Sequence, residues 1–150
     1  MMNNAELGFG ESAGEVESTL RFSQDLLAES GPHLDNDEQS AIDALPSGSA
    51  LLIVQRGPNE GSRFLLDQDV TTVGRHPNAD IFLDDVTVSR RHAEFHRSGK
   101  SFQVKDLASL NGTYFNGARI DVATLENGSE VQVGKFRMTF YASKLDLAKG

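Results

Sequence analysis

From residue 50 to residue 141 the chain consists of short apolar segments, three to seven residues long, separated by turns rich in glycine and asparagine. Within the segments apolar and polar residues alternate, as Phe102 and Val104 do with Gln103 and Lys105. A period of two places successive side chains on opposite faces of a strand. No helical period persists over ten residues here. This part of the chain is therefore predicted to be all-β, and many short strands favour a sandwich or a barrel.

Turn signals separate the predicted strands. Asn116-Gly117, between residues 113–115 and the pair Arg119-Ile120, is a strong signal for a hairpin with a type I′ turn. Asn127-Gly128 predicts a further turn. The strands are predicted at residues 50–56, 63–66, 71–74, 80–83, 93–97, 102–106, 113–115, 130–133 and 137–141.

Residues 1–47 differ sharply from the rest in charge. They hold ten acidic residues and one basic residue, whereas residues 48–150 hold twelve acidic and thirteen basic. High net charge with few apolar residues does not offset chain entropy, so a disordered acidic tail is expected over 1–47. Residues 16–29 are the exception, because Phe22 and Leu26 lie four apart. This segment is either a transient helix or a recognition segment that folds on binding.

The composition also bounds the class of protein. Without cysteine there is no disulfide framework, which fits a reducing cytoplasm. The longest apolar run, residues 50–54, is far shorter than the ~20 residues of a membrane helix, and no signal peptide is visible. A nucleic-acid-binding protein needs clustered Lys and Arg, which the net charge of −8 argues against. We expect a cytoplasmic protein that binds neither membrane nor nucleic acid.

Several patterns resemble catalytic or metal motifs without matching them. Residues 128–135 are similar to a phosphate loop, but the spacing is one residue too long and Phe136 stands where Ser or Thr is required. His92, Glu94 and His96 would share one strand face, but no further metal ligand is evident. No nucleophile, base and orienting group stand together. We expect neither an enzyme nor a metal or other cofactor.

Three short segments in predicted loops carry the strongest signal. The segments are Gly74-Arg75, then Ser89-Arg90-Arg91-His92, then Asn111-Gly112-Thr113. Each is weak alone, but together, in this order and between predicted strands, they resemble the motifs of the forkhead-associated (FHA) domain. The resemblance covers about residues 48–142.

The resemblance implies an FHA-type eleven-stranded β-sandwich whose loops at one end bind phosphothreonine peptides. A phosphothreonine carries about −1.5 to −2 charges and three acceptor oxygens, which suit a guanidinium fork and a hydroxyl. The implied phosphothreonine-binding residues are Arg75, Ser89 (through its hydroxyl and its backbone N–H), Asn111 (gripping the peptide backbone), and Arg90 and Thr113 at the rim; the implied structural residues are Gly74, His92 and Gly112.

Longer stretches resemble the actinobacterial GarA/OdhI-type FHA regulators, which have one FHA domain and a phosphorylatable N-terminal tail. Residues 48–54, 80–95 and 109–114 carry this closer resemblance. In the tail, Glu17-Ser18-Thr19-Leu20-Arg21-Phe22 corresponds to the phosphorylated segment of the family, with Ser18 replacing its first threonine. Phe22 is the third residue after Thr19, where FHA domains read a side chain beyond the phosphothreonine. Thr19 is therefore the expected phosphorylation site.

The family resemblance also implies a mechanism. Unphosphorylated, the protein would inhibit 2-oxoglutarate dehydrogenase and NAD-dependent glutamate dehydrogenase and stimulate glutamate synthase. Phosphorylation of Thr19 by a Ser/Thr protein kinase would make the tail bind its own FHA pocket and switch the protein off. The alternative is a phosphothreonine-peptide adaptor that recruits phosphorylated partners in trans. No role is assigned to residues 30–47 or to the C-terminal tail, residues 143–150.

Overall fold

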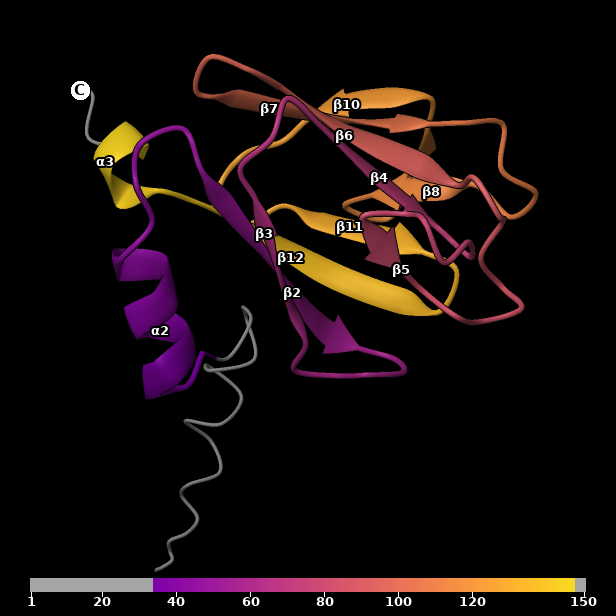
Figure 1. Ribbon diagram of the computed structural model, residues 1–150, viewed down its shortest axis with the longest axis horizontal. Coiled ribbons are helices and arrows are strands. Elements are labelled where there is room, and N and C mark those ends of the chain that lie inside the picture. Colours follow the sequence, from indigo (N-terminus) through magenta and orange to yellow (C-terminus); the bar gives the residue numbers. More distant parts are fainter. Residues whose placement is uncertain (1–33, 148–150) are drawn as a thin grey trace, which may run out of the picture. The chain divides into compact units, whose positions relative to one another are not determined.

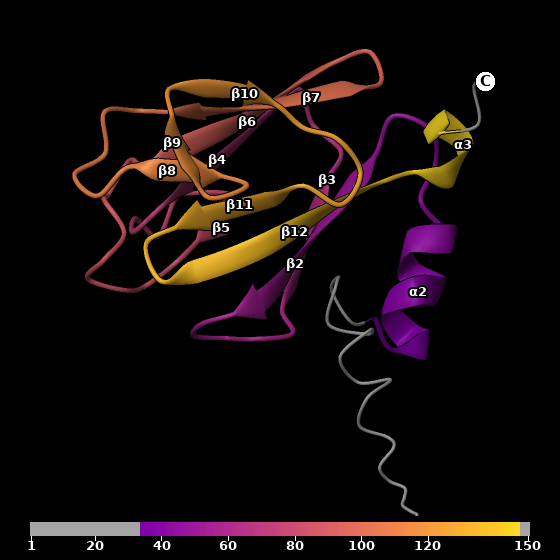
Figure 2. The ribbon, with the colours of Figure 1, turned by 180° about the vertical axis from the view of Figure 1, so that it is seen from behind.

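The computed structural model describes residues 34–147 (Figures 1 and 2). By its internal contacts the chain divides into two units, residues 1–35 and residues 36–150, and the second contains all the strands that the described residues form. The described residues form eleven strands in two sheets, which confirms the predicted FHA-type β-sandwich. The chain follows antiparallel pairings throughout, except that β4 and β5 run parallel.

One sheet has five strands and the other has six. The five-stranded sheet has the order β10 (Val122–Thr124), β7 (Ser101–Asp106), β6 (Ala93–Ser98), β4 (Val70–Gly74) and β5 (Ile81–Phe82). The six-stranded sheet has the order β3 (Arg63–Leu66), β2 (Ala50–Arg56), β12 (Phe136–Ala142), β11 (Glu130–Val133), β8 (Thr113–Phe115) and β9 (Ala118–Ile120).

The core lies between the two sheets and is built from alternate side chains of each strand. On β7 the apolar Phe102 and Val104 are buried while the polar residues between them are exposed. The rings of Phe102 and Phe140 meet across the sandwich, with centroids 5.4 Å apart and planes tilted by 59°. This tilted geometry is favourable for aromatic pairs. Leu52, on β2, belongs to the same cluster and is fully buried.

All nine segments predicted as strands form strands, with ends that shift by no more than one residue. Asn116 and Gly117 have φ angles of 49° and 89°, as a type I′ turn requires, so the predicted hairpin of β8 and β9 is confirmed. The strand β10 was not predicted. Its three residues show no buried side chain, and only pairing with β7 reveals it.

The expected disorder of residues 1–47 is wrong at its C-terminal end. Residues Asn36–Asp43 form the helix α2, with Asp37 and Glu38 in the first turn, where they favour the helix dipole. Ile42 and Leu45 are 7% and 5% exposed. Burial of these two apolar side chains stabilises the segment. The composition of residues 1–47, taken as a whole, is that of a disordered chain and does not reveal two buried residues near its end.

A second short helix, α3 (Lys144–Leu147), fastens the chain before β2 to the chain after β12. The carboxylate of Asp146 accepts hydrogen bonds from the Ser47 hydroxyl (2.5 Å) and the Gly48 backbone N–H (2.9 Å). The buried Ser143 donates to the carbonyl of Leu45 (2.9 Å). We call this arrangement the Asp146 clasp. Both helices lie at one end of the sandwich, and the loops that follow β4 and β7 lie at the other (Figures 1 and 2).

None of the helices within residues 34–147 is long and apolar enough to cross a membrane.

The core makes a direct prediction for stability. Leu52→Ala removes a fully buried side chain from a central strand, so the free energy of unfolding should fall by about 2–5 kcal/mol. Leu65→Ala is the control, because Leu65 lies on β3 with 52% of its surface exposed and should cost about 1 kcal/mol or less. Urea unfolding measures both. Equal losses in the two variants would contradict this placement of the core.

Candidate functional site

Arg75 begins the loop after β4, and the neighbouring loop between β5 and β6 holds it in place. Its backbone N–H donates to the carbonyl of Ser89 (3.0 Å), and its side-chain Nε donates to the carbonyl of Val88 (3.0 Å). The side chain is thereby oriented, while its terminal nitrogens remain available as donors. The close contact requires Gly74, since a Cβ there would overlap with the carbonyl oxygen of Arg90.

His92 lies fully buried behind the site and joins two of its loops. The backbone N–H of Ser89 donates to His92 Nδ1 (3.1 Å), and His92 Nε2 lies 2.9 Å from the carbonyl oxygen of Gly112. Because Nδ1 accepts, the ring proton belongs on Nε2, which donates to Gly112. Burial lowers the pKa of His92, although the Gly112 carbonyl and the nearby Asp106 favour the charged form. The ring is therefore a neutral structural brace.

This bridge changes the expected role of Ser89. Its backbone N–H, predicted to be available to a ligand, is taken by His92. Its hydroxyl oxygen accepts from the backbone N–H of Leu110 (3.0 Å), which leaves the hydroxyl proton to donate outward. The same geometry argues against catalysis by this Ser–His pair. His92 contacts the backbone of Ser89 and not its hydroxyl, so it is not placed as a general base.

Asn111 lies on the loop between β7 and β8. Its Nδ2 donates to the carbonyl of Thr87 (3.0 Å), and the side chain is exposed. The amide carbonyl oxygen and a second N–H remain for a ligand, which is the donor and acceptor pair that a peptide backbone requires. Gly112 adopts a φ of +86°, which permits the turn after Asn111.

Thr113 does not lie at the rim, contrary to the sequence prediction. It is fully buried at the start of β8, and its hydroxyl donates to Asp106 (2.7 Å). Asp106 also accepts from the hydroxyl (2.6 Å) and backbone N–H (3.2 Å) of Ser109. Burial opposes the charge of Asp106, but these hydrogen bonds outweigh it and lower its pKa. Thr113 and Asp106 therefore shape the turn that presents Asn111.

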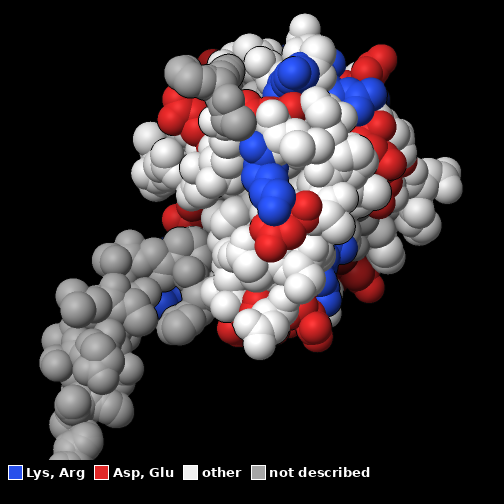
Figure 3. Space-filling view, turned by 90° about the vertical axis from the view of Figure 1, so that its left-hand side faces the viewer, with Lys and Arg blue, Asp and Glu red and all other residues white. Residues whose placement is uncertain are grey.

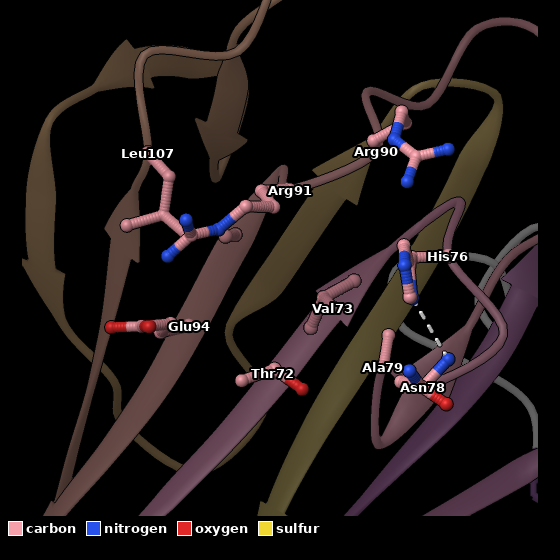
Figure 4. Close-up of a pocket in the computed structure, with 10 residues that line it drawn as sticks. Thr72, Val73, His76, Asn78, Ala79, Arg90, Arg91, Glu94 and Leu107 are labelled. Carbon is pink, nitrogen blue, oxygen red and sulfur yellow. Dashed lines mark hydrogen bonds between the residues drawn. The ribbon is translucent and has the colours of Figure 1, made fainter.

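Arg90 and Arg91 extend the site toward a hollow on the outer side of β4 and β6 (Figure 4). Arg91 lies beside Leu107 on one side of this hollow, and His76, whose Nδ1 accepts from the Asn78 backbone N–H (3.0 Å), lies on the other. The Arg90 side chain extends away from the hollow in this view. Both arginines are exposed, so the hollow adjoins the site through cationic side chains.

The arginines of the site have no acidic partner in the part of the chain that the structure describes. Within residues 34–147, Arg75, Arg90 and Arg91 form no ion pair, whereas Arg97 pairs with Asp69 (3.1 Å). At the end of the sandwich that carries α2 and α3, basic and acidic atoms lie side by side (Figure 3). Unpaired positive charge is thus available at the loop end for an anionic ligand.

Sequence reasoning missed Thr87, which connects three parts of the site. Its carbonyl accepts from Asn111, and its hydroxyl accepts from the backbone N–H of Lys135 (3.0 Å). The same hydroxyl donates to Asp85, whose pKa is lowered chiefly by this bond and the one from the Thr87 backbone N–H. The pattern Asp-x-Thr, in which a carboxylate accepts from the N–H two residues later, could have signalled this turn.

Arg119 was also missed. Its guanidinium packs so closely on Gly112 that a Cβ at Gly112 would lie 2.6 Å from Nε. Gly112 is thus required by contact as well as by its backbone angle. Arg119 lies on β9, distant in sequence from the three motifs, and no local signal links it to them.

The site therefore brings together a guanidinium, a hydroxyl and an amide from three loops, beside arginines that form no ion pair with any described residue. Charge-assisted donors of this kind suit a phosphate group, and the amide suits the adjoining peptide backbone. Of the predicted binding residues, the structure brings Arg75, Ser89, Asn111 and Arg90 to this end and excludes Thr113 from the surface. Among the described residues, no group of three His, Asp or Glu is placed to hold a metal ion.

Comparison with known proteins agrees with this geometry. The model of the FHA domain family matches residues 71–134. The chain is 55% identical to the oxoglutarate dehydrogenase inhibitor of Corynebacterium jeikeium, over 87% of this chain and 92% of that protein. It is 60% identical to the glycogen accumulation regulator GarA of Mycolicibacterium smegmatis, over 83% of this chain and 81% of that protein. The chain belongs to the GarA/OdhI-type FHA family.

A solved structure from a study of phosphothreonine-dependent FHA domain interactions has the same fold. It superposes with a TM-score of 0.58 at 29% identity, covering 62% of this chain and 95% of that one. The two relatives described above are named as an inhibitor and a regulator, and this GarA/OdhI-type protein is a regulator with an FHA domain, not an enzyme. Thr19 and the segment 16–29 lie outside the described residues.

The brace formed by His92 predicts a pH dependence. Its pKa in the folded protein is lowered, so the unfolded state binds the proton more readily, starting near the ordinary value of about 6.5. The free energy of unfolding should be at its full value above this pH and should fall as pH decreases below it. Asp85 and Asp106 act in a separate window, below their ordinary pKa of 3.8.

Denaturant unfolding between pH 8 and pH 5 measures the effect, and His92→Gln, which does not titrate, should show a shallower slope. NMR titration of the His92 ring gives an independent reading. Stability that stays constant or rises as the pH is lowered from 7 to 5 would contradict the neutral brace.

Proposed function

We propose that this protein binds phosphothreonine peptides through Arg75, Ser89 and Asn111, with Arg90 at the rim. The observation that carries the proposal is the convergence of these side chains from three loops, at the end where the arginines pair with no acidic residue within 34–147. The Arg75 guanidinium and the Ser89 hydroxyl would bind phosphate oxygens. Asn111 would bind the backbone beside the phosphothreonine, and His92, Gly74 and Gly112 would hold the loops in position.

The proposed ligand is the protein's own N-terminal segment, phosphorylated at Thr19 by a Ser/Thr protein kinase. In the unphosphorylated state the same end of the domain would bind enzymes of the 2-oxoglutarate branch point in the cytoplasm. These are 2-oxoglutarate dehydrogenase and glutamate dehydrogenase, which it would inhibit, and glutamate synthase, which it would stimulate. The name of the Corynebacterium jeikeium relative supports the first of these partners. Closure by the phosphorylated segment would then release the enzymes.

The position of α2 sets the length of chain available for closure. Thr19 precedes Asn36 by 17 residues, so a fully extended segment spans at most about 61 Å. A domain of this size has a radius of gyration of about 13 Å and a diameter of about 35 Å. The chain can reach across the domain, but it is shorter than a tether starting at residue 48 would be. A shorter tether gives the segment fewer ways to reach its own site. Binding of the phosphorylated segment to the site of a second copy would then compete with closure within one chain.

The binding site can be tested with single variants. Arg75→Ala removes a charged donor to the phosphate and should weaken binding of a synthetic peptide, residues 13–25 with phosphothreonine at position 19, by about 10- to 100-fold. Ser89→Ala should weaken it by about tenfold. Calorimetry measures both. Lys144→Ala is the control, since this exposed lysine lies on α3 at the far end, and its affinity should match the wild type. Wild-type affinity in both site variants would refute the assignment.

The switch can be tested with Thr19→Ala. Kinase treatment should abolish inhibition of 2-oxoglutarate dehydrogenase by the wild-type protein, because the phosphorylated segment occupies the site. The Thr19→Ala protein should still inhibit the enzyme after the same treatment, and its NMR spectrum should not change. Loss of inhibition in treated Thr19→Ala would refute the switch at Thr19. Binding only to phosphorylated enzymes would instead support an adaptor acting in trans.

A further inference from the structure

The hollow on the outer side of β4 and β6 adjoins the proposed phosphate-binding residues but has no role in the function proposed so far. His76, which follows Arg75, and Arg90 and Arg91, which follow Ser89, all line it. The backbone N–H of Arg75 donates to the carbonyl of Ser89 (3.0 Å), so the two chain segments that lead into the hollow lie side by side. Since successive Cα atoms are about 3.8 Å apart, the hollow begins within two residues, or about 8 Å, of the phosphate-binding groups.

The hollow combines apolar walls with a guanidinium that has no acidic partner among the described residues. Val73 and Ala93 line it and are buried, and Leu107 is half-buried at its side. The Arg91 side chain lies beside Leu107 (Figure 4). Arg91 is exposed and forms no ion pair within residues 34–147. A charge pair formed against apolar walls is screened less than one in open water, which favours binding of an anionic group here.

The acidic groups near the hollow are engaged elsewhere. Glu94 lines the hollow, but its carboxylate lies 2.8 Å from His96 Nε2. Asp80, on the loop between β4 and β5, accepts from the backbone N–H (2.9 Å) and the hydroxyl (3.1 Å) of Thr72. Neither carboxylate pairs with Arg91. The Arg91 guanidinium is therefore available to a carboxylate from outside the described part of the chain.

The size of the hollow favours a side chain of a bound peptide over a free small molecule. Its volume is about 220 Å³. Sites for small-molecule ligands usually have about 300–1,000 Å³. In the proposed function a phosphothreonine peptide already lies within two residues of the hollow. The side chains next to Thr19 are therefore the candidates to occupy it.

The charges around Thr19 are distributed unequally along the sequence. Residues 13–18, which precede it, hold two acidic residues and no basic one. Residues 20–24, which follow it, hold one basic residue and no acidic one. A cationic group two residues from the phosphate therefore distinguishes the two directions in which the segment can lie.

The alternation of side chains identifies the residue involved. In an extended segment, residues two apart point to the same face, so Glu17 and Arg21 both share the face of Thr19. If the segment lies in one direction, Glu17 comes next to Arg90 and Arg91, which is favourable. If it lies in the other, Arg21 takes this place, and like charges meet.

Phe22 is the apolar competitor for the hollow, because an aromatic ring suits its walls. In an extended segment, however, the Phe22 side chain points to the face opposite that of Thr19. Placing Phe22 at the hollow also brings the neighbouring Arg21 toward Arg91. The carboxylate of Glu17 meets neither obstacle.

We propose that Arg91 binds the carboxylate of Glu17, two residues before the phosphothreonine, and that this ion pair fixes the direction in which the N-terminal segment lies across the site. The inference rests on the proposed function, in which this segment is the ligand. It makes Arg91 a specificity-determining residue, distinct from the residues that bind the phosphate. Segments with an acidic residue two positions before the phosphothreonine are then preferred over segments with a neutral or basic one.

A double-mutant cycle tests the pair, using the full-length unphosphorylated protein and the synthetic peptide of residues 13–25 with phosphothreonine at position 19. Exposed ion pairs contribute up to about 1 kcal/mol, so Glu17→Gln in the peptide should weaken binding to the wild type about three- to fivefold. The same change should weaken binding to Arg91→Ala by less than about twofold. Calorimetry at about 0.15 M salt measures both.

Arg90→Ala is the matched control, because Arg90 is the adjacent arginine and its side chain extends away from the hollow (Figure 4). This variant should bind both peptides more weakly, but the factor between them should stay at about three to five. A charge exchange gives an independent reading. Arg91→Glu should reject the wild-type peptide, and Glu17→Arg in the peptide should restore at least about threefold of the lost affinity.

The other outcomes contradict the inference. An equal effect of Glu17→Gln in the wild type, Arg91→Ala and Arg90→Ala would show general attraction without a specific pair. If Leu107→Ala abolished the effect of Phe22→Ala in the peptide, Phe22 would occupy the hollow and the direction would be reversed. Peptide binding that requires Arg75 but ignores Glu17 would refute this inference alone. Absence of peptide binding by the wild type would refute the proposed function first. Thermal unfolding of every variant checks that the fold is retained.

Discussion

The buried ring of His92 is the interaction on which the binding end depends. It accepts from the backbone of Ser89 with one nitrogen and donates to the backbone of Gly112 with the other. The β5–β6 loop and the β7–β8 loop, which crosses between the sheets, therefore share one rigid element. A longer, flexible side chain would lose more conformational freedom in making both bonds. The ring also provides hydrogen-bond partners for two backbone groups in irregular loops. Without them these groups would carry the desolvation penalty of an unsatisfied buried polar group.

Around this brace, the loops divide their polar groups between holding one another and facing outward. Arg75 uses Nε, Ser89 uses its backbone N–H and one lone pair, and Asn111 uses one amide N–H for internal bonds. What remains of each side chain is directed by those bonds before any ligand arrives. Such preorganisation lowers the entropy cost of binding. It is consistent with a site that recognises one modified residue in a segment tethered to the same chain.

The sequence predicted the sheets well because their cause is local. Alternation on β7 and the Asn116-Gly117 turn can each be read from a few consecutive residues. The motifs likewise placed Arg75, Ser89 and Asn111, since close contacts at Gly74 and Gly112 tie them to particular spacings. What could not be read arises from long-range contact.

Thr113 illustrates the limit, because its buried hydroxyl donates to Asp106, which lies at the end of β7 in the other sheet. Arg119 packs on Gly112 through a hairpin whose register no motif encodes. The helix α2 forms in a polar stretch because Ile42 and Leu45 find a surface to pack against, which composition does not reveal. In each case the deciding partner lies far away in the sequence or in a different element.

The Asp146 clasp lets the C-terminal segment determine how many residues before β2 are free of the domain. By binding Ser47 and Gly48, a residue four positions from the last fixes the point at which the chain leaves the sandwich toward α2. Loss of the clasp would add about a dozen residues of free chain ahead of β2, and the local concentration of a tethered ligand changes with tether length. In the proposed switch, the balance between closure within one chain and binding to a second copy would thus depend on contacts at the end of the domain opposite the proposed phosphothreonine site.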